Sequence, residues 1–475
     1  MLHVESGGIV DREGKRVHLK GVALGGWLNM EHFILGYPGT ETAFRNAVKC
    51  VLGEDKASFF FERLLENFIT EDDIEFIAGL GCNVVRVALN YRLFEDDGNP
   101  FFFKEEGFRH LDRVIEYARR HGVYVIIDLH AVQGWQNPDW HCDNPYQATL
   151  IWSHSQYRER FYSLWRCIAR RYRDEETVAG YDVMNEPVTG DPKALNEVYN
   201  GVLKAIRSVD TEHIVFLKGN LWGTSFEEID HPDDENIVYS VHHYVLPGLV
   251  DAPYPTKLEG KIFDKHVLEE EYVKKTMVPR KRGTPIYVGE FGSIFYGTGN
   301  DVYRVAVDED LMSIFNKYGD HWTRWTYKDI GVMGLVYLSG DTPWMKFTER
   351  VRRIKRILGT DEWGPGSREG FSSKLTRSIL EELKNTLRNE GVEYRDISID
   401  YEGRRPPEKL KEAYSFSRNL KKALSNLLAL YTLHLLAEQF SRLDYKELEK
   451  LAESFHLSNC IVRKKLAEAF KKYCK

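Results

Sequence analysis

The sequence predicts an α/β protein built on a (β/α)8 TIM barrel, with an additional mostly α-helical C-terminal region. From about Val17 to Ser339, short runs rich in Val, Ile and Tyr alternate with amphipathic stretches of helical length. There are eight such runs, and eight units over about 320 residues favour a closed barrel over an open doubly wound sheet. After about Gly364 the alternation stops and helical segments dominate.

The eight predicted strands are brief, and polar residues or glycines end most of them, as expected for strands buried on both faces. In chain order they are residues 17–26, 82–89, 123–130, 178–187, 213–220, 236–244, 284–291 and 321–329. Helix candidates lie between them. In residues 105–122, for example, Leu111, Val114 and Ile115 recur at the helical period, and Gly122 is a typical C-terminal residue.

The C-terminal region predicts helices over residues 373–389, 407–441 and 445–473, with a short β-like run at 392–403. Glycines and a proline in residues 362–370 indicate a boundary, so we predict a barrel domain 1–365 and a helical extension 366–475. The apolar helix around Leu427 to Leu436 must bury its surface. Packing against the barrel, formation of a homo-oligomer and peripheral membrane contact are the three alternatives.

The composition excludes some classes of partner and compartment. A net charge of −7 argues against nucleic-acid binding, which normally requires a basic surface. Residues 1–17 lack the apolar core of a secretory signal, and the six cysteines form no CxxC pair. We therefore expect reduced thiols and a cytoplasmic location.

Polar side chains gather where the predicted strands end, which is where barrels of this class place their functional groups. Strands two, three, four, six, seven and eight contribute, in order, Arg86, His130, Asn185 with Glu186, His242 with Tyr244, Glu290 and Trp325. Strands four and seven lie on opposite sides of the barrel mouth, so Glu186 and Glu290 are expected to face each other. Two carboxyls about 5–5.5 Å apart suit double displacement at the anomeric carbon of a sugar.

The neighbouring residues assign the two roles. Glu290 is the predicted nucleophile, because the guanidinium of Arg86 and the phenol of Tyr244 favour its ionised form. Glu186 is the predicted acid/base, because burial and the charge of Glu290 favour its protonated form. His242 is predicted to modulate that proton.

The remaining candidates are predicted to bind substrate. Asn185 is placed to hold the sugar 2-hydroxyl, and Trp325 offers a flat face to the ring. His130 either contacts sugar or holds the strand end through hydrogen bonds. Trp135 lines an outer subsite or packs in the loop, and Asn29 or Glu31 is a candidate for binding a terminal sugar. No metal is predicted, because the spacing of the residues following Trp140, HCD, matches no zinc pattern.

Taken together, Arg86, His130, the tripeptide Asn185-Glu186-Pro187, His242-x-Tyr244, Glu290 and Trp325 resemble the characteristic site of glycoside hydrolase family 5 over about residues 8–345. The resemblance implies a (β/α)8 fold, net retention, β-linked glucose- or mannose-containing substrates and no cofactor. The stretches GVALGGWLNMEHF and DLHAVQGWQN are most similar to the exo-β-glucanase branch. The chain departs from that branch in the longer loop AVQGWQNPDWHCDNPYQ and in its helical tail.

The predicted function is that of a retaining glycoside hydrolase that cleaves β-linked glucosides, of the exo-β-glucanase or β-glucosidase type. An endo-β-glucanase or a β-mannosidase on the same site is the alternative. A glucosylceramide-type lipid glycosidase, suggested by the apolar tail, is more remote. A non-catalytic carbohydrate-binding barrel would be expected to lack one of the two carboxylates. Transglycosylation by the same site also stays open.

Overall fold

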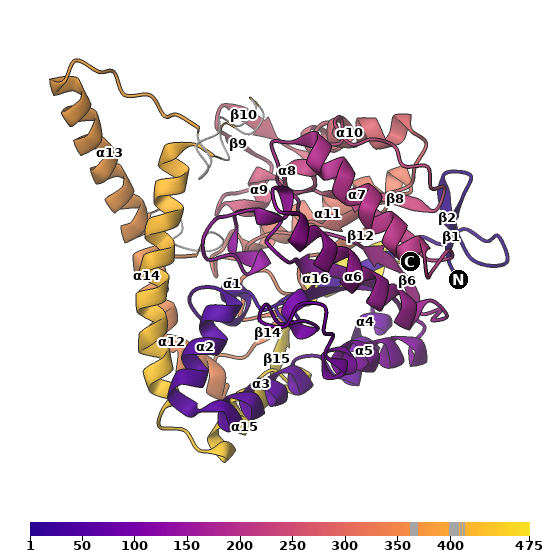
Figure 1. Ribbon diagram of the computed structural model, residues 1–475, viewed down its shortest axis with the longest axis horizontal. Coiled ribbons are helices and arrows are strands. Elements are labelled where there is room, and N and C mark those ends of the chain that lie inside the picture. Colours follow the sequence, from indigo (N-terminus) through magenta and orange to yellow (C-terminus); the bar gives the residue numbers. More distant parts are fainter. Residues whose placement is uncertain (362–368, 399–407, 409–410, 412–413) are drawn as a thin grey trace.

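The computed structural model describes residues 1–361, 369–398, 408, 411 and 414–475 (Figure 1). Eight parallel strands close into a barrel, which confirms the predicted fold class. They are β3 (Lys20–Leu24), β4 (Val84–Asn90), β5 (Tyr124–Ala131), β6 (Val178–Asp182), β7 (Ile214–Lys218), β8 (Ile237–His242), β11 (Ile286–Glu290) and β12 (His321–Arg324). Each overlaps one predicted run, because a strand covered on both faces is apolar along nearly its whole length.

Helices surround the barrel (Figure 1). They are α1 (His32–Leu35), α2 (Glu41–Leu52), α3 (Glu54–Phe68), α4 (Glu71–Gly79), α5 (Arg109–Arg120), α6 (Ser155–Tyr172), α7 (Pro192–Arg207), α8 (Asn220–Gly223), α9 (Leu246–Leu249), α10 (Lys265–Lys281), α11 (Asp301–Tyr318) and α12 (Pro343–Leu358). The predicted face of α5 is confirmed, since Leu111, Val114 and Ile115 are buried. Gly122 follows with φ +66°, as a C-terminal glycine should.

Short strands complete the barrel region. They are β1 (His3–Glu5), β2 (Gly8–Val10), β9 (Thr256–Leu258), β10 (Lys261–Phe263), β13 (Lys328–Asp329) and β14 (Val336–Leu338). β1 pairs with β2 and β9 with β10, in both cases antiparallel.

The interior of the barrel is layered by the two-residue period of its strands. An apolar layer includes Val84, Ile126, Phe216 and Val238. Two positions further along the same strands come Arg86, Asp128, Lys218 and Ser240, all fully buried. The next inward positions include His130 and His242, at the mouth. The sequence period therefore places a charged layer directly beneath the predicted site.

Most of the C-terminal region packs on the outside of the barrel, while its first helix, residues 371–389, points away from it (Figure 1). It comprises α13 (Phe371–Asn389), α14 (Phe416–Phe440), α15 (Tyr445–Glu453), β15 (Cys460–Val462) and α16 (Lys464–Tyr473). α14 contacts α2, α12 and α13, α15 contacts α3, and α16 contacts α11. Ring contacts such as Phe440 with Phe60, 5.1 Å between centroids, join the tail to the core.

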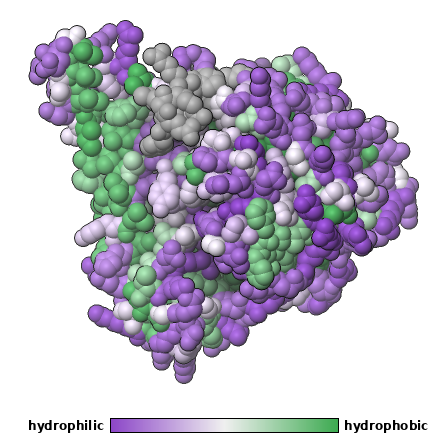
Figure 2. Space-filling view, in the orientation of Figure 1, coloured by the Kyte–Doolittle hydropathy of each residue, from purple (hydrophilic) through white to green (hydrophobic). Residues whose placement is uncertain are grey.

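Part of the outer surface of α14 stays apolar. Leu427, Leu430 and Tyr431 are exposed there, and Figure 2 shows a hydrophobic band over this side of the molecule. Self-association and membrane contact remain predictions for it. Within the ranges given above, no helix reaches the combination of length and hydropathy needed to cross a bilayer.

The predicted continuous helix over 445–473 is wrong. β15 interrupts it and pairs antiparallel with β14, because its Ile461 and Val462 are β-branched residues that suit a strand. Of the predicted β-like run, the described residues 392–398 contribute only a single bridge between Ser398 and Ser415. Residues 362–368 of the predicted linker lie outside the described residues. The division into 1–365 and 366–475 stays a prediction.

Candidate active site

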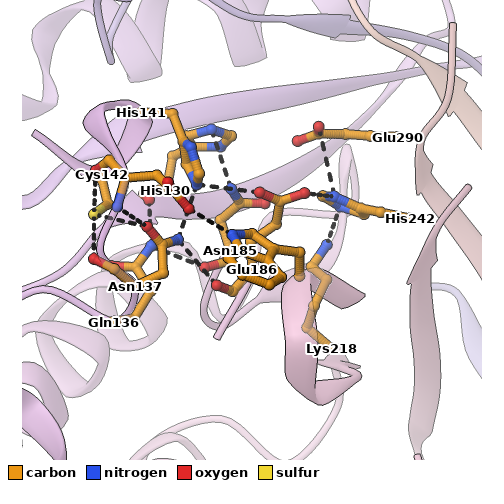
Figure 3. Close-up of polar contacts among 12 residues, drawn as sticks. His130, Gln136, Asn137, His141, Cys142, Asn185, Glu186, Lys218, His242 and Glu290 are labelled. Carbon is orange, nitrogen blue, oxygen red and sulfur yellow. Dashed lines mark hydrogen bonds and ion pairs between the residues drawn. The ribbon is translucent and has the colours of Figure 1, made fainter. Parts of the chain in front are cut away.

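The two predicted carboxylates meet at the mouth of the barrel (Figure 3). Glu290 is the last residue of β11, and Glu186 follows β6 with an unusual positive φ of +45°. Glu186, His242 and Glu290 each bring one side-chain N or O atom within 4.8 Å of those of the other two. That separation is well below the roughly 6.5–9.5 Å that leaves room for a water between two carboxyls, and it suits direct attack by one of them.

Glu290 is held by two donors. Arg86 Nη1 donates to its Oε1 at 2.7 Å, and the Tyr244 hydroxyl donates to Oε2 at 2.9 Å. Burial nevertheless raises the pKa of Glu290, with Arg86 opposing the rise and the charge of Glu186 adding to it. The expected stabilisation of the ionised form by Arg86 is therefore present, but desolvation outweighs it.

Glu186 lies between two histidines (Figure 3). His242 Nδ1 is 2.6 Å from its Oε1, and His141 Nε2 is 3.1 Å from its Oε2. Although burial alone would lower the pKa of His141, the hydrogen bond to Glu186 and its charge raise it to about 9. Glu186 thus faces one neutral donor and one cationic donor.

Lys218 sets the tautomer of His242. Its Nζ lies 2.9 Å from His242 Nε2 and 2.8 Å from both Asp182 Oδ2 and Ser240 Oγ. An ammonium has no lone pair to offer, so Nε2 must accept and the ring proton must sit on Nδ1, directed at Glu186. Burial, followed by the charge of Lys218, lowers the pKa of His242 well below its usual value, which keeps the ring neutral.

A glycine makes room for this ammonium. A Cβ at Gly289 would lie 2.9 Å from Lys218 Nζ and 3.1 Å from His242 Nε2. Contacts this short would force the ammonium or the imidazole to shift, so the glycine before Glu290 preserves the geometry beneath the site.

A second chain of hydrogen bonds orients Asn185. Its Oδ1 accepts from Arg86 Nη2 at 2.7 Å, and its Nδ2 lies 3.1 Å from His130 Nε2. His130 Nδ1 donates in turn to Asp128 Oδ2 at 2.7 Å, since an ionised carboxylate only accepts. The amide of Asn185 therefore has one possible orientation, which fixes it beside Glu186.

A small cavity lies between the two carboxylates, with a volume of about 40 Å³. It is lined by Glu31, Phe33, His130, His141, Glu186, Tyr244, Glu290, Trp325 and Met333. The indole of Trp325 is stacked on His130 at 5.1 Å between centroids. A Cβ at Gly25 would lie 2.5 Å from that indole, so glycine is required behind it.

Glu31 brings a third carboxyl into the cavity. It is 5% exposed, and its Oε1 makes no hydrogen bond within the described part of the chain. Burial raises the pKa of Glu31 well above its usual value, and the charges of Glu290 and Glu186 act in the same direction. A protonated Glu31 can both donate and accept, as binding to a hydroxyl requires.

The structure brings most of the predicted site residues together, but two lie elsewhere. Asn29 is fully buried and donates through Nδ2 to the carbonyl of His141 at 2.9 Å. Trp135 donates to the carbonyl of Asp143 at 2.9 Å. Neither is among the residues that line the cavity, so both act on the loop after β5 in this structure.

Sequence reasoning missed two residues of the site. Lys218 lies within the predicted buried strand HIVFLKGN. A lysine in such a strand is a signal that the sequence offers. His141 offered no such signal in the sequence, because it lies in a loop without periodicity and its neighbours match no zinc pattern. Their contacts to His242 and Glu186 appear only in the folded chain.

The cluster Glu186, His242 and Glu290 also has the spacing of a metal site. However, both ring nitrogens of His242 already have partners, Lys218 and Glu186. Both oxygens of Glu290 accept hydrogen bonds as well. Because these atoms are already hydrogen-bonded to one another and to Lys218, Arg86 and Tyr244, the cluster suits the transfer of a proton better than the binding of a metal.

Comparisons with known proteins agree with this geometry. The family model for cellulase (glycosyl hydrolase family 5) matches residues 47–331. The chain is 35% identical to a β-xylosidase of Phanerodontia chrysosporium, over 97% of this chain and 96% of that protein. It is 32% identical to a probable glucan 1,3-β-glucosidase A of Aspergillus clavatus, over 48% of this chain and 55% of that protein. The solved structure of cellulose synthase subunit Z from Clostridioides difficile matches with a TM-score of 0.50 at 18% identity, covering 67% of this chain and 94% of that one.

Proposed function

The chain belongs to glycoside hydrolase family 5, and from this premise we propose that it is an exo-acting enzyme that removes one terminal sugar from a β-linked glycoside or short oligosaccharide. Family membership makes the protein a retaining β-glycosidase, an O-glycosyl hydrolase. The observation that carries the exo-acting proposal is the small size of the cavity between Glu186 and Glu290.

The cavity supports a terminal sugar as the substrate. Its volume of about 40 Å³ has room for only a few waters, at about 10–15 Å³ each, so lining side chains must shift before a sugar ring enters. Phe33 follows β3, His141 follows β5 and Met333 follows β12, so the enclosing residues come from three separate loops. An enzyme that cleaves within a chain needs room for sugars on both sides of the scissile bond.

In this proposal the reaction proceeds by double displacement. Glu290 attacks the anomeric carbon as the glycosidic C–O bond breaks, and Glu186 gives its proton to the leaving oxygen. Water then attacks the glycosyl-enzyme, Glu186 takes a proton from that water, and Glu290 is released. Because the anomeric carbon is inverted twice, the product keeps the β configuration.

The remaining cavity residues are proposed to bind the sugar. Trp325 presents an indole face to the ring, while Asn185, fixed by Arg86 and His130, is placed to bind the 2-hydroxyl. Glu31, with an unpartnered oxygen, is proposed to bind a hydroxyl at the terminal end of the sugar.

Glucosides are the substrates that the sequence predicts, and xylosides are a second candidate. The relative that aligns with nearly the whole chain, tail included, is named as a β-xylosidase. Glucose and xylose share their ring hydroxyl configuration and differ by the hydroxymethyl group of glucose. A cytoplasmic location also remains part of the proposal, and all six cysteines are free thiols.

A substrate panel tests the proposal. Aryl β-glucoside, aryl β-xyloside and aryl β-mannoside would be compared with cello- and laminari-oligosaccharides and with long polymers. We expect release of single sugars with retained configuration, observed by NMR at early times. Internal cleavage of long chains without monosaccharide release would refute the exo-acting assignment. Oligosaccharides longer than the substrate, formed at high substrate concentration, would reveal transglycosylation.

A further inference from the structure

The loop after β5 brings a histidine to Glu186. His141 lies on η3 (Trp140–Cys142), a short 3-10 helix within this loop, and its Nε2 is 3.1 Å from Glu186 Oε2. Asn137, four residues earlier, donates through Nδ2 to the backbone carbonyl of Glu186 at 2.9 Å. The loop is thus joined to both the side chain and the backbone of Glu186 (Figure 3).

The C-terminal helix α14 holds this loop. Asp139, the residue before η3, pairs with Lys422 of α14 and accepts from Trp222 Nε1 at 2.6 Å. Asp139 is 5% exposed and Lys422 is 7% exposed, so the pair is nearly out of water. Breaking a buried pair of this kind is strongly destabilising, which makes it an effective tether.

We propose that His141 is a positioning residue that shares one proton with Glu186, and that α14 keeps it there through the Lys422–Asp139 pair. The inference rests on the proposed role of Glu186 as the acid/base. It also gives the helical tail a function in the reaction.

The proton balance uses atoms already in contact. While Nε2 of His141 carries the proton, it donates to Oε2 of Glu186. When this proton moves to Glu186, Glu186 can give it to the leaving oxygen, and His141 is left neutral. Asn137 Nδ2 lies 2.8 Å from Nε2 and only donates, so it favours this neutral form of His141 and must turn from Nε2 while that nitrogen carries the proton. The water that attacks the glycosyl-enzyme returns a proton to Glu186, which restores the pair.

The charges around His141 favour the shared proton. Burial lowers the pKa of its imidazole, but the contacts with Glu186 and the charge of Asp139 outweigh that effect and raise it. The neighbouring rings of His130 and His32 are kept neutral, since burial lowers the pKa of each well below its usual value. Lys422 and Arg418 from α14 act on Asp139 rather than directly on the ring.

The pH profile of kcat/KM tests the sharing of a proton. With an aryl glycoside of poor leaving group, the wild-type basic limb should fall near pH 9, where the pair loses its proton. His141→Gln keeps a hydrogen-bond donor but cannot titrate, so its basic limb should move down by at least about one pH unit. The exposed His434→Gln on α14 is the matched control, with an unchanged profile. A folded His141→Gln variant with the wild-type basic limb would overturn the proposal.

A second set of variants tests the tether. Lys422→Met should shift the basic limb in the same direction as His141→Gln, and Lys422→Arg should restore it. Lys446→Met, at an exposed position on α15, is the matched control. If Lys422→Met fails to fold, Lys422→Gln removes the ion pair while leaving the charge of Asp139 in place. A wild-type profile in either folded tether variant would refute the role of the tail.

The outcomes separate this inference from the proposed function. An enzyme that hydrolyses no glycoside in the panel contradicts the proposed function. An active enzyme whose basic limb of kcat/KM is unchanged in the His141→Gln variant contradicts only the proposal of a shared proton.

Discussion

Replacing Lys218 by Met is expected to affect stability and catalysis through one cause, the loss of a buried positive charge. Around Arg86 and Lys218 lie three carboxylates, Asp128, Asp182 and Glu290, so two cations face three anions. Lys218→Met leaves one cation against three. One carboxylate must then take up a proton or remain buried without sufficient compensation.

The structure indicates the size of the effect. Lys218 is fully buried and contacts Asp182, Ser240 and His242 at 2.8, 2.8 and 2.9 Å. Removing one partner of a buried ion pair costs about 3–5 kcal/mol. The charge of Lys218 also favours ionised Glu290, so its loss should raise the pKa of Glu290 further.

Two measurements check this reasoning. Denaturant unfolding at pH 7 should show the loss of about 3–5 kcal/mol. The acid limb of kcat/KM for an activated aryl glycoside should move to higher pH, because catalysis requires ionised Glu290. Ser240→Ala is the matched control. It removes only a neutral partner of the same ammonium, at a cost of about 1 kcal/mol, and should leave the acid limb in place. A Lys218→Met variant that loses less than about 1 kcal/mol and keeps its acid limb would refute the argument.

Four further predictions follow from other contacts. Glu290→Gln should fold normally and retain less than about 1% of kcat; higher activity in a purified sample would count against its role as nucleophile. Glu186→Ala should slow glycosides with poor leaving groups by about 10²–10⁴-fold and activated aryl glycosides far less, and equal losses would contradict the acid/base assignment. Gly25→Ala should displace the Trp325 indole and lower kcat/KM by about 100-fold, while unchanged kinetics and tryptophan fluorescence would show that the ring tolerates the methyl group. Burial would raise the pKa of Asp210, but hydrogen bonding to His213 lowers it to about 2. Ionised Asp210 therefore contributes about 2–3 kcal/mol to the free energy of unfolding above about pH 4, and this contribution is lost towards pH 2. Asp210→Asn should therefore destabilise the protein at pH 7 but much less at pH 2, and a difference independent of pH, measured by denaturant unfolding, would exclude this linkage.

The barrel and the centre of its site were predictable because both follow from local patterns. Strands buried on both faces are apolar along their length, and the carboxyl ends of parallel strands meet at one mouth. Glu186, His242 and Glu290 therefore come together whatever the loops do. The sequence also identified the partners of Glu290, but it could not weigh them against desolvation. Burial raises the pKa of Glu290 despite Arg86, because the depth of a side chain is a property of the packed molecule.

The tail and the loop after β5 were decided by tertiary structure alone. Lys422 meets Asp139 across 283 residues, and no local period indicates that contact. β15 interrupts a segment that reads as helix, because β14, more than 120 residues earlier in the chain, lies beside it and offers a strand to pair with. His141 reaches Glu186 because its loop is held from both sides, by Asn29 and by Lys422. By itself, the sequence determined the fold, the pair of carboxylates and the residues at the strand ends. The charges and hydrogen bonds around that pair depend on contacts between loops and tail, which form only when distant segments pack together.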